Sequence, residues 1–164
     1  MKRERGGFRM LRREQLLEEL VHDSYKEDHK PREPARCPGC GASWRKGRWT
    51  WETADEGAHD HLCPACHRIR DDFPAGYVTL AGPFLQEHRA EIQGLVAHCE
   101  AAEKARYPLQ RIMAMKPGQE GLLITTTDVH LARTIAERVH DAYQGALEFS
   151  YNKAENLLRA SWTR

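Results

Sequence analysis

The segment CPGCGASWRKGRWTW, residues 37–51, combines two cysteines, three basic residues and three tryptophans, and a second pair, CPAC, follows at 63–66. Together they form C-x2-C-x22-C-x2-C. Tetrahedral zinc takes four thiolates at about 2.3 Å, and each CxxC turn presents two of them together. The spacing therefore predicts a zinc ribbon in which Cys37, Cys40, Cys63 and Cys66 hold one structural Zn²⁺ ion.

Other uses of these cysteines are less consistent with the pattern. A single CxxC also occurs in thiol–disulfide active sites, but two matched pairs without a surrounding βαβ unit argue against one. Four thiolates leave no open position for water, so a catalytic zinc is not expected. One alternative stays open, in which His59, His61 or His67 replaces a cysteine. Zinc contributes on the order of 10 kcal/mol to the folding of such a small module.

The basic and aromatic residues after Cys40 allow two interpretations. In the first, Arg45, Lys46 and Arg48 contact phosphates while Trp49 or Trp51 stacks on an unpaired base. In the second, the tryptophans cover the zinc or dock the module on the rest of the chain. The nearby cations then only balance the charge of −2 on a Zn(Cys)4 centre. The cations of this second interpretation are Arg36, Arg45, Lys46, Arg48, Arg68 and Arg70.

Composition predicts a polar, soluble protein of one ordinary domain or two small ones. The 164 residues are 40% hydrophobic and 30% charged, and no run approaches the roughly 18 apolar residues of a membrane span. The basic segment MKRERGGFRMLRREQ lacks the apolar core of a signal peptide, so we expect a cytoplasmic protein without a membrane partner. Residues 1–50 carry 13 Lys and Arg against 8 Asp and Glu, and residues 51–164 carry 12 against 16. The basic half permits contact with phosphate or with an acidic protein.

The apolar periodicity predicts an α+β fold in three parts. Residues 1–35 form an amphipathic helix at 8–23 and a charged linker, residues 36–76 the zinc ribbon, and residues 77–164 an α+β sandwich. The sandwich has the order β-α-β-β-α-β-β, and its first six elements match a ferredoxin-like fold with helices on one sheet face. Its elements are a strand at 77–82, a helix at 84–106, a hairpin of 109–116 with 121–127, a helix at 128–145, and strands at 145–151 and 156–164.

No catalytic set emerges, so we expect a non-enzymatic protein. In TTTDVHLAR, residues 125–133, Thr127 or Asp128 is the expected N-cap, and His130 and Arg133 form a surface pair without an assigned role. The pattern G-x-x-x-x-G-K-[ST] is absent, so no nucleotide cofactor is expected. Cys99 lies on an apolar helix face as a small buried hydrophobe. An enzyme would instead need a deep polar pocket with shifted ionisable groups near Asp128 and His130.

The segments CPGCGASWRKGRWTW, CPACHRIRDDFPAGYVTLAGPF and GLLITTTDVHLAR resemble a family of small bacterial zinc-ribbon proteins, over residues 22–164. That family is similar to the zinc-bearing region of the archaeal and eukaryotic adaptor proteins of the large ribosomal subunit, which are named for nonsense-mediated decay and linked to subunit export. The shared pattern is a CxxCG knuckle with a Gly-Arg/Lys-Trp step, and later a helix of the HLAR-x-IA type.

The resemblance implies association with RNA, most of all ribosomal RNA, through the metal module. The positions that match the family's pattern are the four cysteines, Gly47, Arg48 and Trp49, and more weakly residues 130–133. The chain departs from the adaptors in having two CxxC pairs where they have a longer series. Because subunit export has no meaning in a bacterium, the resemblance implies RNA or ribosome binding and not export. The alternative is a protein–protein interaction module without nucleic-acid binding, in which the ribbon and its tryptophans dock on a partner.

Overall fold

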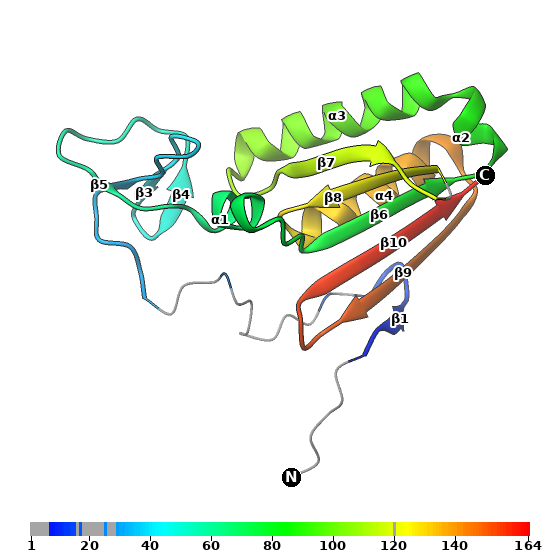
Figure 1. The fold of residues 1–164 in the computed structure, drawn as a ribbon, viewed down its shortest axis with the longest axis horizontal. Coiled ribbons are helices and arrows are strands. Elements are labelled where there is room, and N and C mark those ends of the chain that lie inside the picture. Colours follow the sequence, from blue (N-terminus) through cyan, green and yellow to red (C-terminus); the bar gives the residue numbers. More distant parts are fainter. Residues whose placement is uncertain (1–6, 16, 18–24, 26–28, 120) are drawn as a thin grey trace, which may run out of the picture.

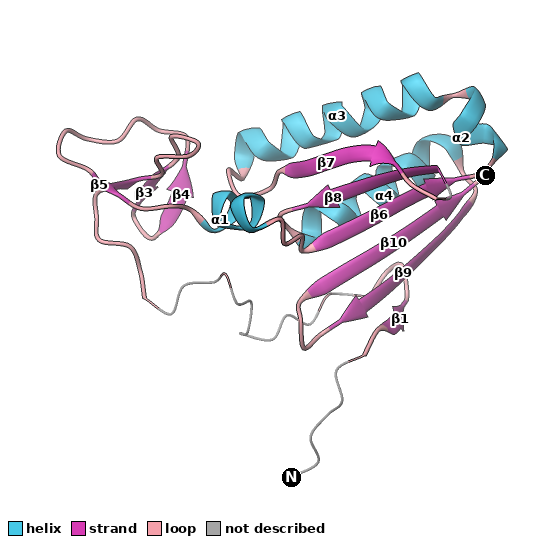
Figure 2. Cartoon of the chain, viewed as in Figure 1, coloured by secondary structure: helices cyan, strands magenta, loops and turns pink. Residues whose placement is uncertain are grey.

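The computed structural model describes residues 7–15, 17, 25, 29–119 and 121–164. They form an α+β protein with two separate sheets, one small and one large (Figure 1). We call residues 35–71 the metal module, and residues 76–164 with the short strand near the N-terminus the sheet domain. Figure 2 shows the metal module at one end of the sheet domain. Within the described residues, no helix is both long and apolar enough to cross a membrane.

The metal module is a four-stranded sheet followed by one short helix. Its central hairpin turns at Lys46 and Gly47, whose φ angles of 50° and 76° are those of a two-residue turn with both central residues left-handed. The sheet order is β4-β3-β2-β5. The elements are β2 (Ala35–Arg36), β3 (Ser43–Arg45), β4 (Arg48–Thr50), β5 (His59–Asp60) and α1 (Pro64–Asp71).

The sheet domain packs its helices on one face of the large sheet (Figure 2). Its core includes Trp162, Phe149 and Leu80, which have no more than 2% of their surface exposed. The helix expected over 84–106 is interrupted at His88. The elements are β6 (Gly76–Ala81), α2 (Pro83–Glu87), α3 (Arg89–Arg106), β7 (Ile112–Pro117), β8 (Gly121–Thr126), α4 (Val129–Tyr143), β9 (Ala146–Asn152) and β10 (Leu157–Thr163).

The strand order agrees with a split βαβ unit and then departs from the ferredoxin-like order. As expected, β8 lies between β6 and β7 and is antiparallel to both. A ferredoxin-like order would place β9 beside β6, but β10 takes this position, parallel to β6, and β9 lies outside it. The reason is burial: Leu158, Ala160 and Trp162 of β10 all face the core, and a central strand buries such an alternating apolar face most completely. Glu148 of β9 is exposed.

The helix expected at 8–23 is wrong where the structure describes this segment. Residues Arg9–Leu11 form β1, which extends the sheet antiparallel to β9, and residues 12–15 are not helical. The outer edge of β9 would otherwise leave unpaired backbone N–H and C=O groups, and pairing with β1 satisfies them. Arg133 of α4 also donates to the backbone carbonyls of Arg13 and Gln15. Residues 16 and 18–23 of the expected helix lie outside the described residues.

Gly76 allows α4 to pack closely against β6. A Cβ atom at this position would lie 2.4 Å from the Cβ atom of Ala132 and 2.5 Å from the Oγ1 atom of Thr126. We therefore expect Gly76→Ala to lower the free energy of unfolding by about 1–3 kcal/mol, measured by urea denaturation. The control is Gly94→Ala in α3, where a Cβ meets nothing within 4 Å and should stabilise by about 0.5–1 kcal/mol. Equal effects at both positions would contradict the assigned packing.

Candidate metal centre

The first cysteine pair lies on a tight turn after β2. The Cys37 N–H donates to the Ala42 carbonyl over 2.7 Å, and the Gly41 N–H donates to the Cys37 carbonyl over 2.9 Å. Gly41 has a φ of 81°, which favours glycine. Gly39 lies against the second pair, because a Cβ there would be 2.9 Å from the Cys66 Sγ atom. The glycines of CPGCG therefore let the turn close over the cluster.

The second pair lies at the N-terminal turn of α1. Cys63 is the N-cap, and its Sγ atom accepts the Cys66 N–H over 3.4 Å. Pro64 occupies the first turn, where its missing N–H costs nothing. The Cys63 N–H in turn donates to the Cys37 Sγ atom over 3.3 Å. The positive end of the helix dipole thus faces sulfur atoms that carry negative charge when metal-bound.

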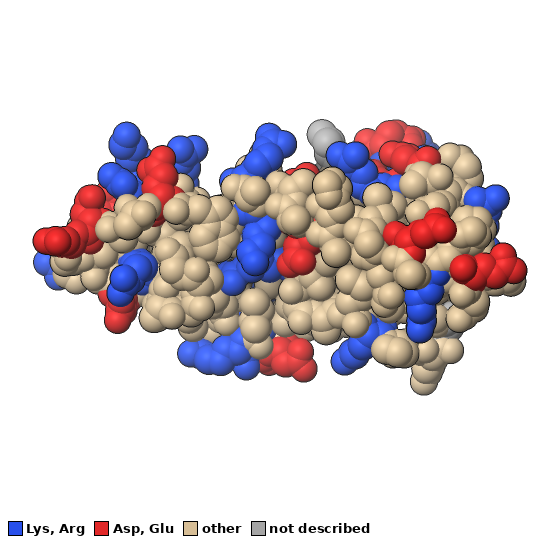
Figure 3. Space-filling model, turned by 90° about the horizontal axis from the view of Figure 1, so that it is seen from above, with Lys and Arg blue, Asp and Glu red and all other residues tan. Residues whose placement is uncertain are grey.

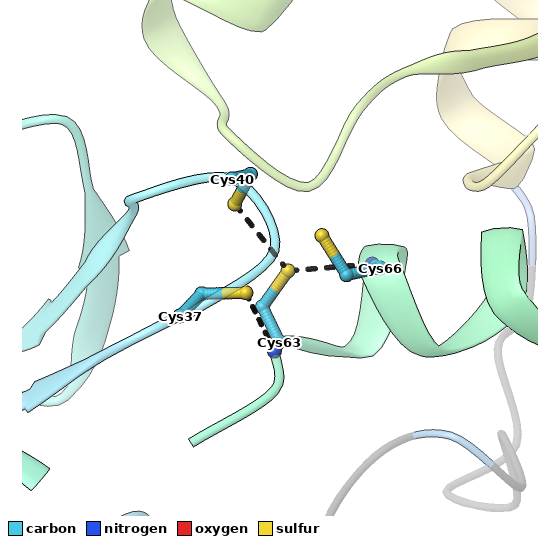
Figure 4. Close-up of side chains that lie close together, drawn as sticks. All are labelled: Cys37, Cys40, Cys63 and Cys66. Carbon is cyan, nitrogen blue, oxygen red and sulfur yellow. Dashed lines mark hydrogen bonds between the residues drawn. The ribbon is translucent and has the colours of Figure 1, made fainter. Parts of the chain in front are cut away.

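The four sulfur atoms are close enough for one tetrahedral ion. They converge from the turn and from α1 (Figure 4), and all lie within 4.8 Å of one another. The Cys40 and Cys63 Sγ atoms are 3.8 Å apart. Bonds of about 2.3 Å at tetrahedral angles give a sulfur–sulfur distance of about 3.8 Å. Among the described residues the cluster contains only the four cysteines, so His59, His61 and His67 are not part of it. The donor set fits a single structural zinc ion.

The thiols of the cluster do not ionise alike. Burial raises the pKa of Cys63, and it also raises the pKa of Cys40, where the neighbouring sulfurs add to the effect. Burial also opposes ionisation of Cys37, but N–H groups of Cys63, Cys40 and Gly39 outweigh it and lower the pKa of Cys37 to about 7. All four thiols can therefore be ionised together only when a cation lies between them, and a divalent metal ion supplies this positive charge.

Arg111 is a functional residue that the sequence does not reveal. It precedes β7 in the sheet domain, 45 residues after Cys66, and is only 7% exposed. Its guanidinium donates to the Cys63 Sγ atom over 3.0 Å and to the Cys66 Sγ atom over 3.3 Å. Burial opposes its charge, but the sulfurs outweigh burial and raise the pKa of Arg111. Arg111 therefore balances part of the negative charge and binds the metal module to the sheet domain. No local signal in QRIMAMK indicates this role.

The tryptophans of the metal module differ in burial: Trp49 is packed in its core and Trp51 is partly exposed. Trp49 is 9% exposed and belongs to the core beside Cys37 and Cys63, with its ring 5.6 Å from that of Trp44. This burial agrees with the second interpretation, in which the tryptophans cover the zinc or dock the module. Trp51 is 37% exposed, and its indole N–H donates to the Lys104 carbonyl of α3 over 2.7 Å. Trp51 thus docks the module on the sheet domain and keeps part of its ring accessible.

The cations near the cluster have different surroundings. Arg45 lies 3.7 Å from Glu52 and 3.8 Å from Asp55. Arg68 is buried, and its guanidinium donates to the Phe73 carbonyl over 2.9 Å. Lys46 and Arg48 are exposed at the turn of the β3–β4 hairpin. Neither has a carboxylate within salt-bridge distance among the described residues.

The third group of candidates has structural roles. Asp128 is the N-cap of α4, and its Oδ2 atom accepts the Leu131 N–H over 3.0 Å. Thr127 instead donates to the Leu109 carbonyl over 2.6 Å. Arg133 does not form a free surface pair with His130, because it binds carbonyls of the segment after β1. Cys99 is buried in the core, and burial raises its pKa, as expected for a small hydrophobe.

Fold and site together define an α+β protein whose four-cysteine metal centre joins a small sheet to a larger domain. Comparisons of the chain with protein-family models, with curated proteins and with solved structures gave no significant match. The resemblance to the ribosomal adaptor proteins is therefore a prediction, and function must be inferred from the site itself.

Proposed function

We propose that this protein is a non-enzymatic, zinc-stabilised RNA-binding protein. We propose further that its target is structured RNA, and specifically ribosomal RNA. In this proposal zinc holds the metal module in shape, and the module presents cations to phosphates. The observation that carries the proposal is the pair Lys46 and Arg48, which are exposed at the hairpin turn and form no salt bridge among the described residues, although the Glu33 carboxylate accepts the Gly47 N–H between them. Cations without a salt-bridge partner can exchange their counterions for phosphates.

The surroundings of the hairpin support this proposal. Figure 3 shows Lys and Arg side chains over the metal module and across its junction with the sheet domain, with Asp and Glu side chains between them on the module. At the junction, Arg106 ends α3, and its guanidinium lies 5.3 Å from the ring centroid of Tyr107. Arg45 contributes less, because Glu52 and Asp55 already balance its charge. Exposed cations next to an exposed aromatic residue are typical of proteins that bind single-stranded or irregular RNA.

Reversing one charge at the hairpin should weaken RNA binding. We expect Arg48→Glu to lower the affinity for ribosomal RNA on the order of tenfold and to reduce the slope of log K against log salt by about one. The measurement is fluorescence anisotropy at several salt concentrations, with zinc content checked for each variant. The matched control is Lys116→Glu in β7, an exposed lysine outside the module, which should leave both quantities close to wild type.

Sedimentation tests the ribosomal part of the proposal. A tagged protein should move with ribosomal subunits in a gradient at low salt and leave them as salt rises. Absence from ribosomal particles, together with an RNA affinity that does not depend on salt, would contradict the proposal.

A protein partner is the second candidate, favoured by one observation. The sheet face away from the helices has a hollow of about 420 Å³ between Met10, Tyr77 and Arg159, and Met10 is one of the exposed apolar residues. The two candidates are distinguished by isolating the tagged protein with whatever is bound to it and treating this complex with ribonuclease. Loss of the complex supports RNA binding, and its survival supports a protein partner.

A further inference from the structure

A groove separates the metal module from the sheet domain, and both parts contribute a wall. One wall is β4 with Arg48, Trp49 and Thr50, and the other is the connection from α3 to β7, residues 106–110. Asp128 at the start of α4 also lines it. The volume of about 480 Å³ is within the range of sites that hold a small molecule or a single residue of a polymer.

Charge in the groove favours an anion. Arg48 and Arg106 stand on opposite walls, and neither has a carboxylate within salt-bridge distance among the described residues. The Asp128 carboxylate accepts the Leu131 N–H as the cap of α4, so the positive end of that helix offsets its charge. Two guanidinium groups facing one hollow are suited to a phosphate group, which each can bind through two parallel hydrogen bonds.

The groove also offers an aromatic ring and an unused polar atom. Tyr107 is 46% exposed, and Pro108 and Leu109 continue its apolar surface. The Gln110 Oε1 atom is buried and accepts no hydrogen bond from the described residues. A buried acceptor without a donor is costly unless a ligand supplies the donor. An N–H group on the edge of a nucleic-acid base is such a donor.

We propose that this groove binds one unpaired nucleotide of an RNA strand, with its base against Tyr107, an N–H of the base on Gln110, and its phosphate between Arg48 and Arg106. The proposal rests on the RNA-binding function inferred above and specifies which RNA feature is recognised. Fully paired RNA offers no base that can leave its stack to enter the groove, whereas loops and bulges do. The groove also exists only while the metal module is docked, because Trp51 and Arg111 hold its two walls together.

The test compares two RNA stems that differ only in one unpaired nucleotide, using zinc-loaded full-length protein and fluorescence anisotropy. We expect wild type to prefer the bulged stem, and Tyr107→Ala to lose about 5- to 100-fold in affinity for it with little change for the paired stem. Tyr107→Phe keeps the ring and should keep the preference. Phe73→Ala removes an aromatic residue of similar exposure outside the groove and should change neither affinity.

The outcomes distinguish this proposal from the general RNA-binding function. If both stems bind equally and Tyr107→Ala loses nothing, RNA binding stands and the groove assignment is wrong. If neither stem binds, both proposals are wrong. A free nucleoside monophosphate serves as the third probe. If the monophosphate binds as tightly as the bulged stem, and the Tyr107→Ala variant no longer binds it, the groove is a small-molecule site. The assignment to an RNA strand is then overturned.

Discussion

Replacement of Cys63 by serine should remove zinc and unfold the metal module while the sheet domain stays folded. Serine is a good N-cap, so the start of α1 is preserved and the change isolates metal binding. The module has a small core of Cys37, Ala42, Trp49, Cys63 and Ala65, so loss of the metal should cost it on the order of 10 kcal/mol. The sheet domain has its own larger core around Trp162. Zinc content and amide hydrogen exchange over residues 35–71 measure the effect.

A matched control uses the cysteine outside the cluster. Cys99→Ala removes a buried thiol from the core of the sheet domain and should keep one zinc per chain. Burial raises the pKa of Cys40 and Cys63, so zinc must displace their protons at neutral pH, and zinc affinity should rise with pH. Retention of stoichiometric zinc and protected amides in the Cys63→Ser variant would contradict the assigned site.

Replacement of Arg111 by methionine should separate the two parts of the molecule. Methionine fills a similar volume without donating to the Cys63 and Cys66 sulfurs. The Arg111 backbone N–H still donates to the Thr127 Oγ1 atom, so the start of β7 is retained. We expect zinc affinity to fall about 10- to 100-fold, as for other residues that support metal ligands. The module should also move independently, which small-angle scattering and faster exchange at the Trp51 indole N–H would report.

The conservative variant distinguishes charge from geometry. Arg111→Lys keeps a positive charge, but a lysine cannot donate to both sulfurs with the fixed fork of a guanidinium. Its zinc affinity should therefore lie between those of wild type and Arg111→Met. Wild-type affinity and unchanged scattering in Arg111→Met would show that the module docks by other contacts, such as the hydrogen bond from Trp51 to Lys104.

The sequence by itself determined the features that depend on neighbours along the chain. The C-x2-C spacing sets the distance between two sulfurs, and the second pair completes a set of four, so the zinc ligands follow from local geometry. Asp128 caps α4 because its side chain reaches the N–H of Leu131, three residues later. The apolar period of 3.6 identifies α4, and the turn before Gly121 identifies the β7–β8 hairpin.

Only the tertiary structure decided the features that join distant segments. β10 lies between β9 and β6 because its buried face needs a central position, and β1 is a strand because it completes the edge of β9. Trp49 packs beside the cysteines of the cluster, although its sequence context also allows exposure. Arg111 reaches the sulfurs from 45 residues away because burial of negative charge requires a cation wherever the fold supplies one. Such pairings depend on which surfaces meet in space, and no local rule of spacing or periodicity encodes them.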